Sequence, residues 1–184
     1  MSKLDIQLAC QHLRQGDVIA YPTEAVWGLG CDPFNEAAVS TILRLKSRPV
    51  EKGLILVAGE IEAFEPLLRE LSDEQIATLT ASWPGHITWI VPDPKHVTPN
   101  WIRGSHQSVA IRVSNHPVVQ ALSSGFAGPI VSTSANEAGE KEIRSRLILE
   151  EKFADSIAGI VEGELGQDGA PSEIRDLVSG ETLR

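Results

Sequence analysis

Hydrophobic residues along the chain follow two alternating periods, one typical of helices and the other of strands. In the first segment, Ile6, Cys10 and Leu13 fall on one helical face. Such spacings predict helices at 4–15, 35–45, 61–71, 72–82, 117–122 and 147–153. Short apolar runs predict strands at 18–21, 54–57, 87–91, 109–113, 129–133, 157–161, 173–177 and 181–183, with the last two joined through Ser179-Gly180.

Residues with known preferences for helix ends support several of these boundaries. Gly16 follows the first helix, and Asn35 has the side chain of a helix N-cap. Pro49 forbids continuation of the second helix. Ser72 and Gln75 have the spacing of a capping box, and Pro117 suits the first turn of a helix.

Strands interleaved with helices, some of them joined as hairpins, predict an α/β fold with a mixed parallel and antiparallel sheet. The chain has 184 residues, which is the length of one domain, so we expect residues 1–184 to form a single domain. At this length about 70% of the unfolded surface can be buried. Intrinsic disorder is therefore excluded as the default state.

Composition narrows the classes of function. With 16 Lys and Arg against 25 Asp and Glu, the formal charge is −9 and the pI is near 5.0, which argues against a broad nucleic-acid-binding face. Cys10 and Cys31 form no CxxC pair, and the five histidines have no paired ligand spacing, so no protein-held metal is expected. The sequence also lacks a run of about 20 apolar residues and an apolar leader, which predicts a cytoplasmic protein without membrane association.

Two polar segments follow predicted elements in the first third of the chain. In 21–30, a proline and two glycines leave Thr23 and Glu24 at a strand end, where ligands bind in open α/β sheets; a plain turn capped by Thr23 is the alternative. In 46–53, the flexible ammonium of Lys46 and the planar guanidinium of Arg48 could together bind several phosphate oxygens. A basic helix C-terminus that interacts with the helix dipole is the alternative there.

Two further polar segments lie in the last third. In 132–136, alternation places Ser132 and Ser134 on one face and Asn136 continues it, so the row can donate to carboxylate or phosphate oxygens. Capping of the strand end is the alternative. The glycine-rich segment 163–176 is either a lid or a solvated connection.

Familiar nucleotide and metal motifs are absent from the sequence. It contains no GxxxxGK[ST] loop, no GxGxxG and no HExxH. The four tryptophans are expected to anchor the core, and His86 to serve a surface or packing role.

Six stretches, taken in order, resemble the YrdC family, specifically the short, single-domain bacterial threonylcarbamoyl-AMP synthases. They are AYPTEAVWGLGCDP, LKSRPVEKGLILVA, WPGHIT, VAIRVSNHP, PIVSTSAN and PSEIRD, and they cover nearly the whole chain. The resemblance implies a YrdC-like fold, in which helices flank a twisted mixed sheet around a concave cavity.

The activity implied by this resemblance is that of a nucleotidyltransferase. It makes threonylcarbamoyl-AMP and pyrophosphate from L-threonine, bicarbonate or CO2, and ATP, with Mg2+ carried by ATP. The product serves threonylcarbamoyladenosine (t6A) modification at position 37 of tRNAs that read ANN codons, through downstream t6A transferase proteins. Two alternatives remain: a double-stranded RNA or tRNA-binding module without adenylating activity, and an accessory protein that keeps only the fold.

The resemblance also assigns roles to individual residues. Lys46 and Arg48 match the KxR signature, while Ser134 and Asn136 match SxN; all four are expected to be catalytic. The remaining assignments are Thr23, Arg112 and Ser132 around threonine, and Lys46, Arg48, Ser108, Ser134, Arg144 and Ser172 around ATP.

The sequence departs from the family pattern at three places. His86 replaces the proline of the usual WPGP. The stretch ANEAGEKEIRS replaces ANxSGxPxxRT, so the Ser-Gly-x-Pro part that precedes Arg144 and Ser145 is lost. The loop 163–171 lacks the usual arrangement of glycines.

Overall fold

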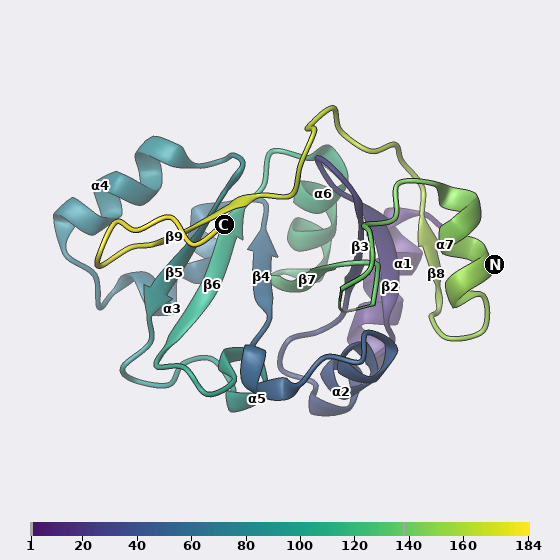
Figure 1. Cartoon of the computed structure of the whole chain (residues 1–184), viewed down its shortest axis with the longest axis horizontal. Helices are drawn as coiled ribbons and strands as arrows, with labels where there is room; N and C mark the ends of the chain where they lie inside the picture. The colour runs from purple at the N-terminus through teal and green to yellow at the C-terminus, as the bar shows by residue number, and fades with distance from the viewer. Residues whose placement is uncertain (1, 138) are drawn as a thin grey trace.

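A twisted sheet of mixed direction organises the chain in the computed structural model, which describes residues 2–137 and 139–184 (Figure 1). Its strands are β1 (Lys3–Leu4), β2 (Ile19–Pro22), β3 (Trp27–Gly30), β4 (Ile55–Ala58), β5 (Ile87–Pro92), β6 (Ser108–Val113), β7 (Ile130–Ser134), β8 (Gly159–Val161) and β9 (Glu173–Asp176). Within the described residues their order is β1-β8-β2-β3-β7-β4-β6-β5-β9. The parallel pairs are β1–β8, β2–β8, β4–β6 and β5–β9, and the other neighbours are antiparallel. The predicted mixed α/β fold is confirmed.

Helices and short 3₁₀ turns connect these strands. They are α1 (Ile6–Gln15), α2 (Glu36–Leu45), η1 (Val50–Lys52), η2 (Ile61–Phe64), α3 (Glu65–Leu68), α4 (Asp73–Ser82), α5 (Asn100–Arg103), α6 (Pro117–Phe126) and α7 (Arg146–Phe153). The predicted caps are confirmed: Asn35 accepts from the N–H of Ala38 at 3.1 Å, and Ser72 and Gln75 form the reciprocal capping box. Gly16 ends α1 in the left-handed conformation, with φ of 85°.

Some elements differ from the prediction. The helix expected over 61–71 is divided into η2 and α3, because Pro66 in the first turn of α3 cannot donate its nitrogen to the preceding turn. The last predicted strand, 181–183, is reduced to a single bridge between Arg175 and Thr182. The short elements β1 and α5 carry too little periodicity to be predicted.

Strand β3 was missed because two of its four residues are glycines. It pairs antiparallel with β2, so the segment after Pro22 is a hairpin rather than an irregular stretch. Gly30 is needed because a Cβ there would lie 2.6 Å from Cε1 of Tyr21 and 2.7 Å from the carbonyl oxygen of Val131. The glycine therefore permits close packing inside the sheet rather than a turn.

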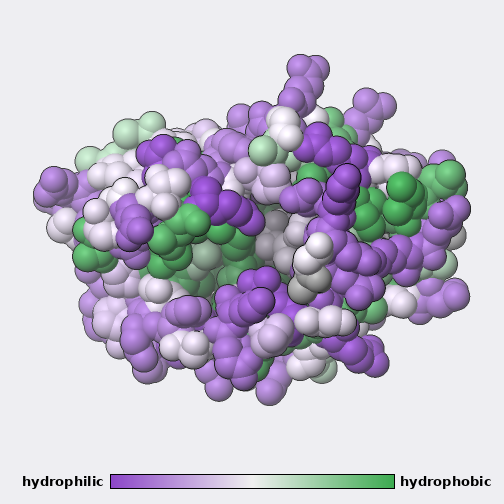
Figure 2. All heavy atoms as spheres, in the orientation of Figure 1, coloured by the Kyte–Doolittle hydropathy of each residue, from purple (hydrophilic) through white to green (hydrophobic). Residues whose placement is uncertain are grey.

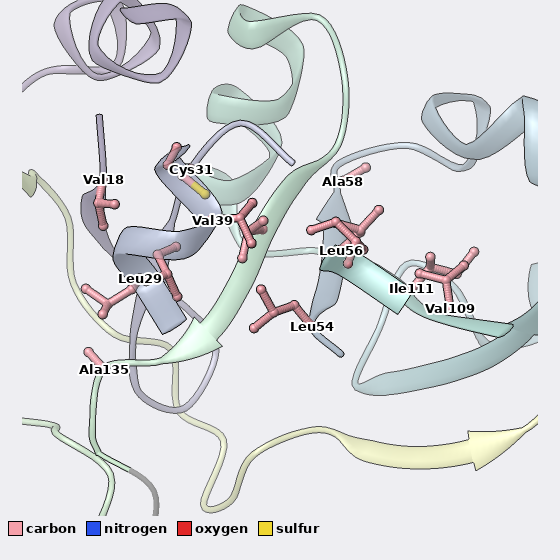
Figure 3. Close-up of a cluster of buried hydrophobic side chains, with 14 of the residues drawn as sticks. Val18, Leu29, Cys31, Val39, Leu54, Leu56, Ala58, Val109, Ile111 and Ala135 are labelled. Carbon is pink, nitrogen blue, oxygen red and sulfur yellow. The ribbon is translucent and has the colours of Figure 1, made fainter. Parts of the chain in front are cut away.

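Two hydrophobic clusters lie against the sheet. One contains Leu13, Tyr21, Val57 and Leu122, where α1 and α6 pack against each other and against the strands. The other is larger and is shown in part in Figure 3, where Val39 of α2 lies between side chains from β3 and β4, and side chains from β6 lie beyond those of β4. Trp27, Trp83 and Trp89 are buried in this cluster and Trp101 packs against it, which confirms their expected role in the core.

We expect Gly30→Ala to destabilise the protein by about 1–3 kcal/mol, because the added methyl group would collide with Tyr21 and with the backbone of β7. Urea unfolding at equilibrium measures the change. Gly128→Ala is the matched control, since nothing lies within 4 Å of a Cβ built there. Equal stabilities of the two variants would contradict this account.

Candidate functional site

A cavity of about 510 Å³ opens on the sheet, between the ends of several strands. In the register of the sheet, Ile55 of β4 pairs with Ser132 of β7 and with Ala110 of β6, and Ala110 pairs with Ile90 of β5. Paired residues point to the same face of a sheet, and all four of these side chains line the cavity. Figure 2 shows a hollow near the middle of this face, with hydrophobic atoms on one wall and hydrophilic residues around the rim. The floor is therefore formed by four neighbouring strands.

Positive charge is concentrated in this cavity although the chain is acidic overall. Its described lining includes three carboxylates, Glu24, Glu137 and Glu142. It includes twice as many cationic side chains, which are Lys46, Arg48, Lys52, Arg103, Arg112 and Arg184. Such an excess inside a concave surface favours anionic ligands.

The end of α2 directs two of these cations into the cavity. The N–H of Arg48 donates to Leu43 and that of Ser47 donates to Arg44, which is the hydrogen-bond pattern of a Schellman motif. Ser47 takes the left-handed position with φ of 49°, where glycine is usual. A non-glycine residue in this conformation is strained, and such strain clusters at functional sites.

Lys46 is almost completely buried and contacts the end of β7. Its Nζ donates to the backbone carbonyls of Ser134 and Asn136. Burial, together with the nearby charges of Arg48 and Lys152, lowers the pKa of Lys46 to about 8. The ammonium thus contacts β7 rather than the carbonyls at the end of its own helix, which weakens the alternative that it only complements the helix dipole.

Arg48 holds the loop that follows it. Its Nε and Nη2 donate to the carbonyl of Gly53 at 3.0 and 2.8 Å. Gly53 has φ of 61°, and a Cβ there would lie 2.9 Å from the carbonyl oxygens of Ile102 and Arg103. Burial lowers the pKa of Arg48, and the like charge of Arg184 lowers it further. Two guanidinium groups therefore approach each other in the cavity.

The polar row at the end of β7 lines the cavity as its alternation predicts. Ser132, Ser134 and Asn136 are all in the lining. The Nδ2 of Asn136 donates to the carbonyls of Glu137 and Glu140 at 3.0 and 2.9 Å. Its Oδ1 is buried and has no hydrogen-bond partner within 2–137 and 139–184.

A buried ion pair lies at the other end of the cavity. Nη1 of Arg112 lies 2.6 Å from Oε1 of Glu24, and the hydroxyl of Ser114 donates to the same oxygen at 2.5 Å. Burial raises the pKa of Glu24, but Arg112 and Ser114 lower it by more, so its net direction is down. Glu24 was left out of the predicted site residues, although its place beside Thr23 at a strand end was the available signal.

Three predicted hydroxyl residues also lie in the lining, two of them with their own hydrogen bonds. The hydroxyl of Thr23 donates to the carbonyl of Val26 at 2.7 Å and accepts from the N–H of Val26 at 3.5 Å, as the turn-capping alternative expects, so one acceptor site remains. The hydroxyl of Ser172 lies 2.8 Å from that of the buried Thr88. Ser108 lines the cavity at the start of β6.

Arg144 is the one predicted site residue that lies outside the described lining. Its Nη2 donates to the carbonyl of Gly169 at 2.6 Å, and its own carbonyl accepts from Nε1 of Trp27 at 3.3 Å. Ala138, in the stretch that departs from the family pattern, lies outside the described residues. Conversely, Arg184 lines the cavity and donates to the carbonyl of Ser172 at 3.1 Å, a placement that no motif in the sequence indicated.

Neither a metal cluster nor a membrane span is found within 2–137 and 139–184. No three His, Cys, Asp or Glu side chains gather there as a metal would require. Among the same residues, no helix has the length and apolar character needed to cross a bilayer.

Comparison with known proteins identifies close relatives. Residues 11–184 match the Sua5_yciO_yrdC family, which carries the description "Telomere recombination". The threonylcarbamoyl-AMP synthase of Pseudomonas paraeruginosa is 50% identical over 184 residues, which cover 100% of this chain and 98% of that protein. The enzyme of the same name from Saccharophagus degradans is 53% identical over 172 residues, covering 94% and 90%.

Solved structures share the architecture. The crystal structure of P. abyssi Sua5 complexed with L-threonine superimposes with a TM-score of 0.91 at 30% identity, covering 100% of this chain. The chain spans 57% of that protein's length. E. coli YciO superimposes with a TM-score of 0.83 at 22% identity over 98% of this chain and 94% of its own, which supports the fold alone.

Proposed function

Since this chain belongs to the Sua5/YciO/YrdC family, we propose that it is an L-threonylcarbamoyladenylate synthase, which uses L-threonine, bicarbonate or CO2, and ATP. The observation that carries the proposal is the convergence of Lys46, Arg112 and Asn136, far apart in sequence, on one cavity with excess positive charge. Two relatives named threonylcarbamoyl-AMP synthase are 50% identical to this chain over its full length. We propose that residues 1–184 act as one domain.

The reaction brings together substrates that repel one another. The amine of threonine adds to bicarbonate with loss of water, or to CO2, and gives a carbamate. A carbamate oxygen then attacks the α-phosphorus of ATP, and the bond from that phosphorus to the pyrophosphate leaving group breaks. All three substrates carry negative charge near neutral pH, so positioned cations and hydrogen-bond donors lower the barrier by orienting them and by offsetting their charges.

We assign the threonine end of the cavity to Thr23, Arg112 and Ser132. Nη1 of Arg112 donates to Glu24, and the other N–H groups of the guanidinium are assigned to the carboxylate of threonine. The remaining acceptor site of Thr23 suits the threonine hydroxyl or amine. The free Oδ1 of Asn136 suits an N–H of the amine or carbamate.

We assign the nucleotide end to Lys46, Arg48, Ser108, Ser134 and Ser172, which all line the cavity. Arg184 joins this group because it faces Arg48 across the same space. Arg144 reaches ATP only if its bond to Gly169 is released. Mg2+ enters with ATP as part of the substrate, and the phosphates supply the oxygen ligands that it prefers.

In the cell, we place this activity in the cytoplasm, where t6A transferase proteins carry the product to position 37 of tRNAs that read ANN codons. The alternative of a tRNA or double-stranded RNA-binding module is less well supported, because these cations gather in one cavity rather than along an extended face. A shallow salt dependence of tRNA affinity agrees with the enzyme, whereas an RNA platform would lose affinity steeply as salt rises.

A turnover assay with radiolabelled bicarbonate, ATP and single amino acids tests the proposal. We expect pyrophosphate release and a labelled adenylate only when threonine and bicarbonate are both present. Equal pyrophosphate release without threonine would overturn it. Binding of neither ATP nor threonine in calorimetry would instead support the accessory-protein alternative.

The turnover rate should fall as the pH rises above about 8. Because the pKa of Lys46 is lowered to about 8, its ammonium is lost above that pH while an unfolded lysine would still be charged. We expect kcat/KM for ATP to decline on this alkaline side of the pH–rate profile. In Lys46→Arg the alkaline decline should move to higher pH, whatever the absolute activity, since a guanidinium stays protonated. An unchanged alkaline decline in that variant would assign the titration to another group.

A further inference from the structure

The segment Gly163–Ser172, here called the strap, runs from β8 to β9 across one edge of the cavity (Figure 1). The N–H groups of Gly166 and Asp168 donate to the carbonyls of Thr23 and Glu24 at 2.9 and 3.0 Å. A Cβ on Gly166 would lie 2.6 Å from the carbonyl oxygen of Glu24, so the strap backbone lies directly on that turn. The strap thus packs on the turn that carries Thr23 and Glu24 at the threonine end, and its last two residues, Pro171 and Ser172, line the cavity.

A histidine contacts the strap near each of its ends. At the first end, Nε2 of His116 lies 3.0 Å from the carbonyl oxygen of Glu164, and its Nδ1 accepts from the N–H of Val118 at 3.3 Å. One proton, on Nε2, satisfies both contacts. The neutral imidazole of His116 can therefore make both of its contacts with the backbone.

His86 at the second end faces two acceptors. Its Nε2 lies 3.1 Å from the carbonyl oxygen of Pro171, which can only accept. Its Nδ1 is buried, and Oδ2 of Asp168 lies 2.8 Å from it in an ion-pair contact rather than an aligned hydrogen bond. A neutral ring that donates to Pro171 would present a lone pair to the carboxylate. Both contacts are favourable only when the ring carries two protons.

Charges of both signs lie on the elements next to His86. Glu173 of β9 interacts electrostatically with His86, and its carboxylate also accepts from Nε of Arg175 at 2.7 Å. Arg184 binds the carbonyl of Ser172 at the end of the strap. Of these charged groups, Asp168 is the one in direct contact with the ring.

We propose that His86 is a positioning residue which, as an imidazolium, fastens the strap through Asp168 and Pro171 over the bound amino acid. This inference rests on the proposed function for the identity of that ligand. Loss of a proton releases the Asp168 end, while His116 keeps the other end in place. Since the side chains of His86 and Asp168 are 38% and 46% exposed, solvent weakens the pair, and we expect an effect of about two- to fivefold on threonine affinity.

Calorimetry with threonine between about pH 5.5 and 7.5 tests the proposal. We expect the Kd of the wild type to rise about two- to fivefold over this range, and that of His86→Ala to be weak throughout. In Asp168→Asn the amide N–H can donate to a neutral Nδ1, so tight binding should persist at the upper pH. Parallel pH profiles in wild type and Asp168→Asn would overturn the proposal.

Hydrogen exchange without any substrate supplies an independent measurement. After correction for intrinsic rates, the amides of Gly166 and Asp168 should lose protection in His86→Ala, while the amide of Ala135, which donates to Trp27, should not change. If the strap responds but threonine does not bind, the proposed function fails and the role of His86 stands. If threonine is converted but strap protection is unchanged in His86→Ala, the inference about His86 fails.

Discussion

Lys46→Ala should lower kcat/KM for ATP by about 10²- to 10³-fold, the range found when one preorganised donor is removed from a reacting site. The loss follows from what the ammonium contacts. It crosses from the end of α2 to the carbonyls of Ser134 and Asn136, so it fixes the polar row of β7 and supplies charge to the cavity. Steady-state kinetics with each substrate varied in turn measures the change.

Folding must be separated from catalysis in this variant, because removal of Lys46 leaves two buried carbonyls without a donor. Thermal unfolding and threonine calorimetry show whether the cavity survives. Lys95→Ala is the matched control, since that lysine is exposed and pairs with Glu70 away from the cavity. A folded Lys46→Ala protein with wild-type turnover would refute the assigned role.

Arg112→Met should raise the KM for threonine, lower kcat/KM by about 100-fold, and destabilise the fold by about 3–5 kcal/mol. The first effects follow from loss of the fork that we assign to the substrate carboxylate. The destabilisation follows because Glu24 stays buried without its partner. Urea unfolding and amino-acid binding measure the two effects separately.

The stability effect has a defined pH dependence. In the wild type the lowered pKa of Glu24 contributes stability above its unfolded value of 4.5, which is lost as the pH falls through the folded pKa. Without Arg112, burial would raise the pKa of Glu24. The stability gap between wild type and Arg112→Met should therefore be largest near neutral pH and narrow in acid.

The double variant Glu24→Gln/Arg112→Met separates structure from function. Its stability should return to within about 1 kcal/mol of the wild type, because neither buried charge remains. Turnover should stay low, since no cation faces the substrate carboxylate. Recovery of threonine affinity in this variant would exclude the proposed role of Arg112. Arg69→Met, just after α3, controls for loss of an exposed arginine.

The sequence predicted most of the fold because its helix ends carry strong local signals. Asn35, Ser72 and Gly16 cap their helices through contacts with nearby residues, and such contacts can be inferred from spacing. Strand β3 was missed because it contains two glycines, of which Gly30 is required by close packing against β7, which is distant in sequence. Long-range packing determines such an element, and local propensity does not reveal it.

The site residues also divide into those that local sequence motifs indicate and those that only the fold reveals. Residues in recognisable motifs, such as Lys46 and Asn136, come together as the resemblance implied. Glu24 stands beside Thr23 at a strand end, but its contact with the distant Arg112 is visible only in the fold, and no motif marks Arg184. The clamp of His86 on Asp168 was also beyond inference, since it depends on where the strap crosses.

The central place of β7 has a consequence for the order in which the protein can assemble during synthesis. Strand β7 joins β3 to β4, yet it is made after both of them. A nascent chain that ends before residue 130 therefore holds two partial sheets with facing edges that lack hydrogen-bond partners. Such edges invite pairing with other chains until the missing strand leaves the ribosome.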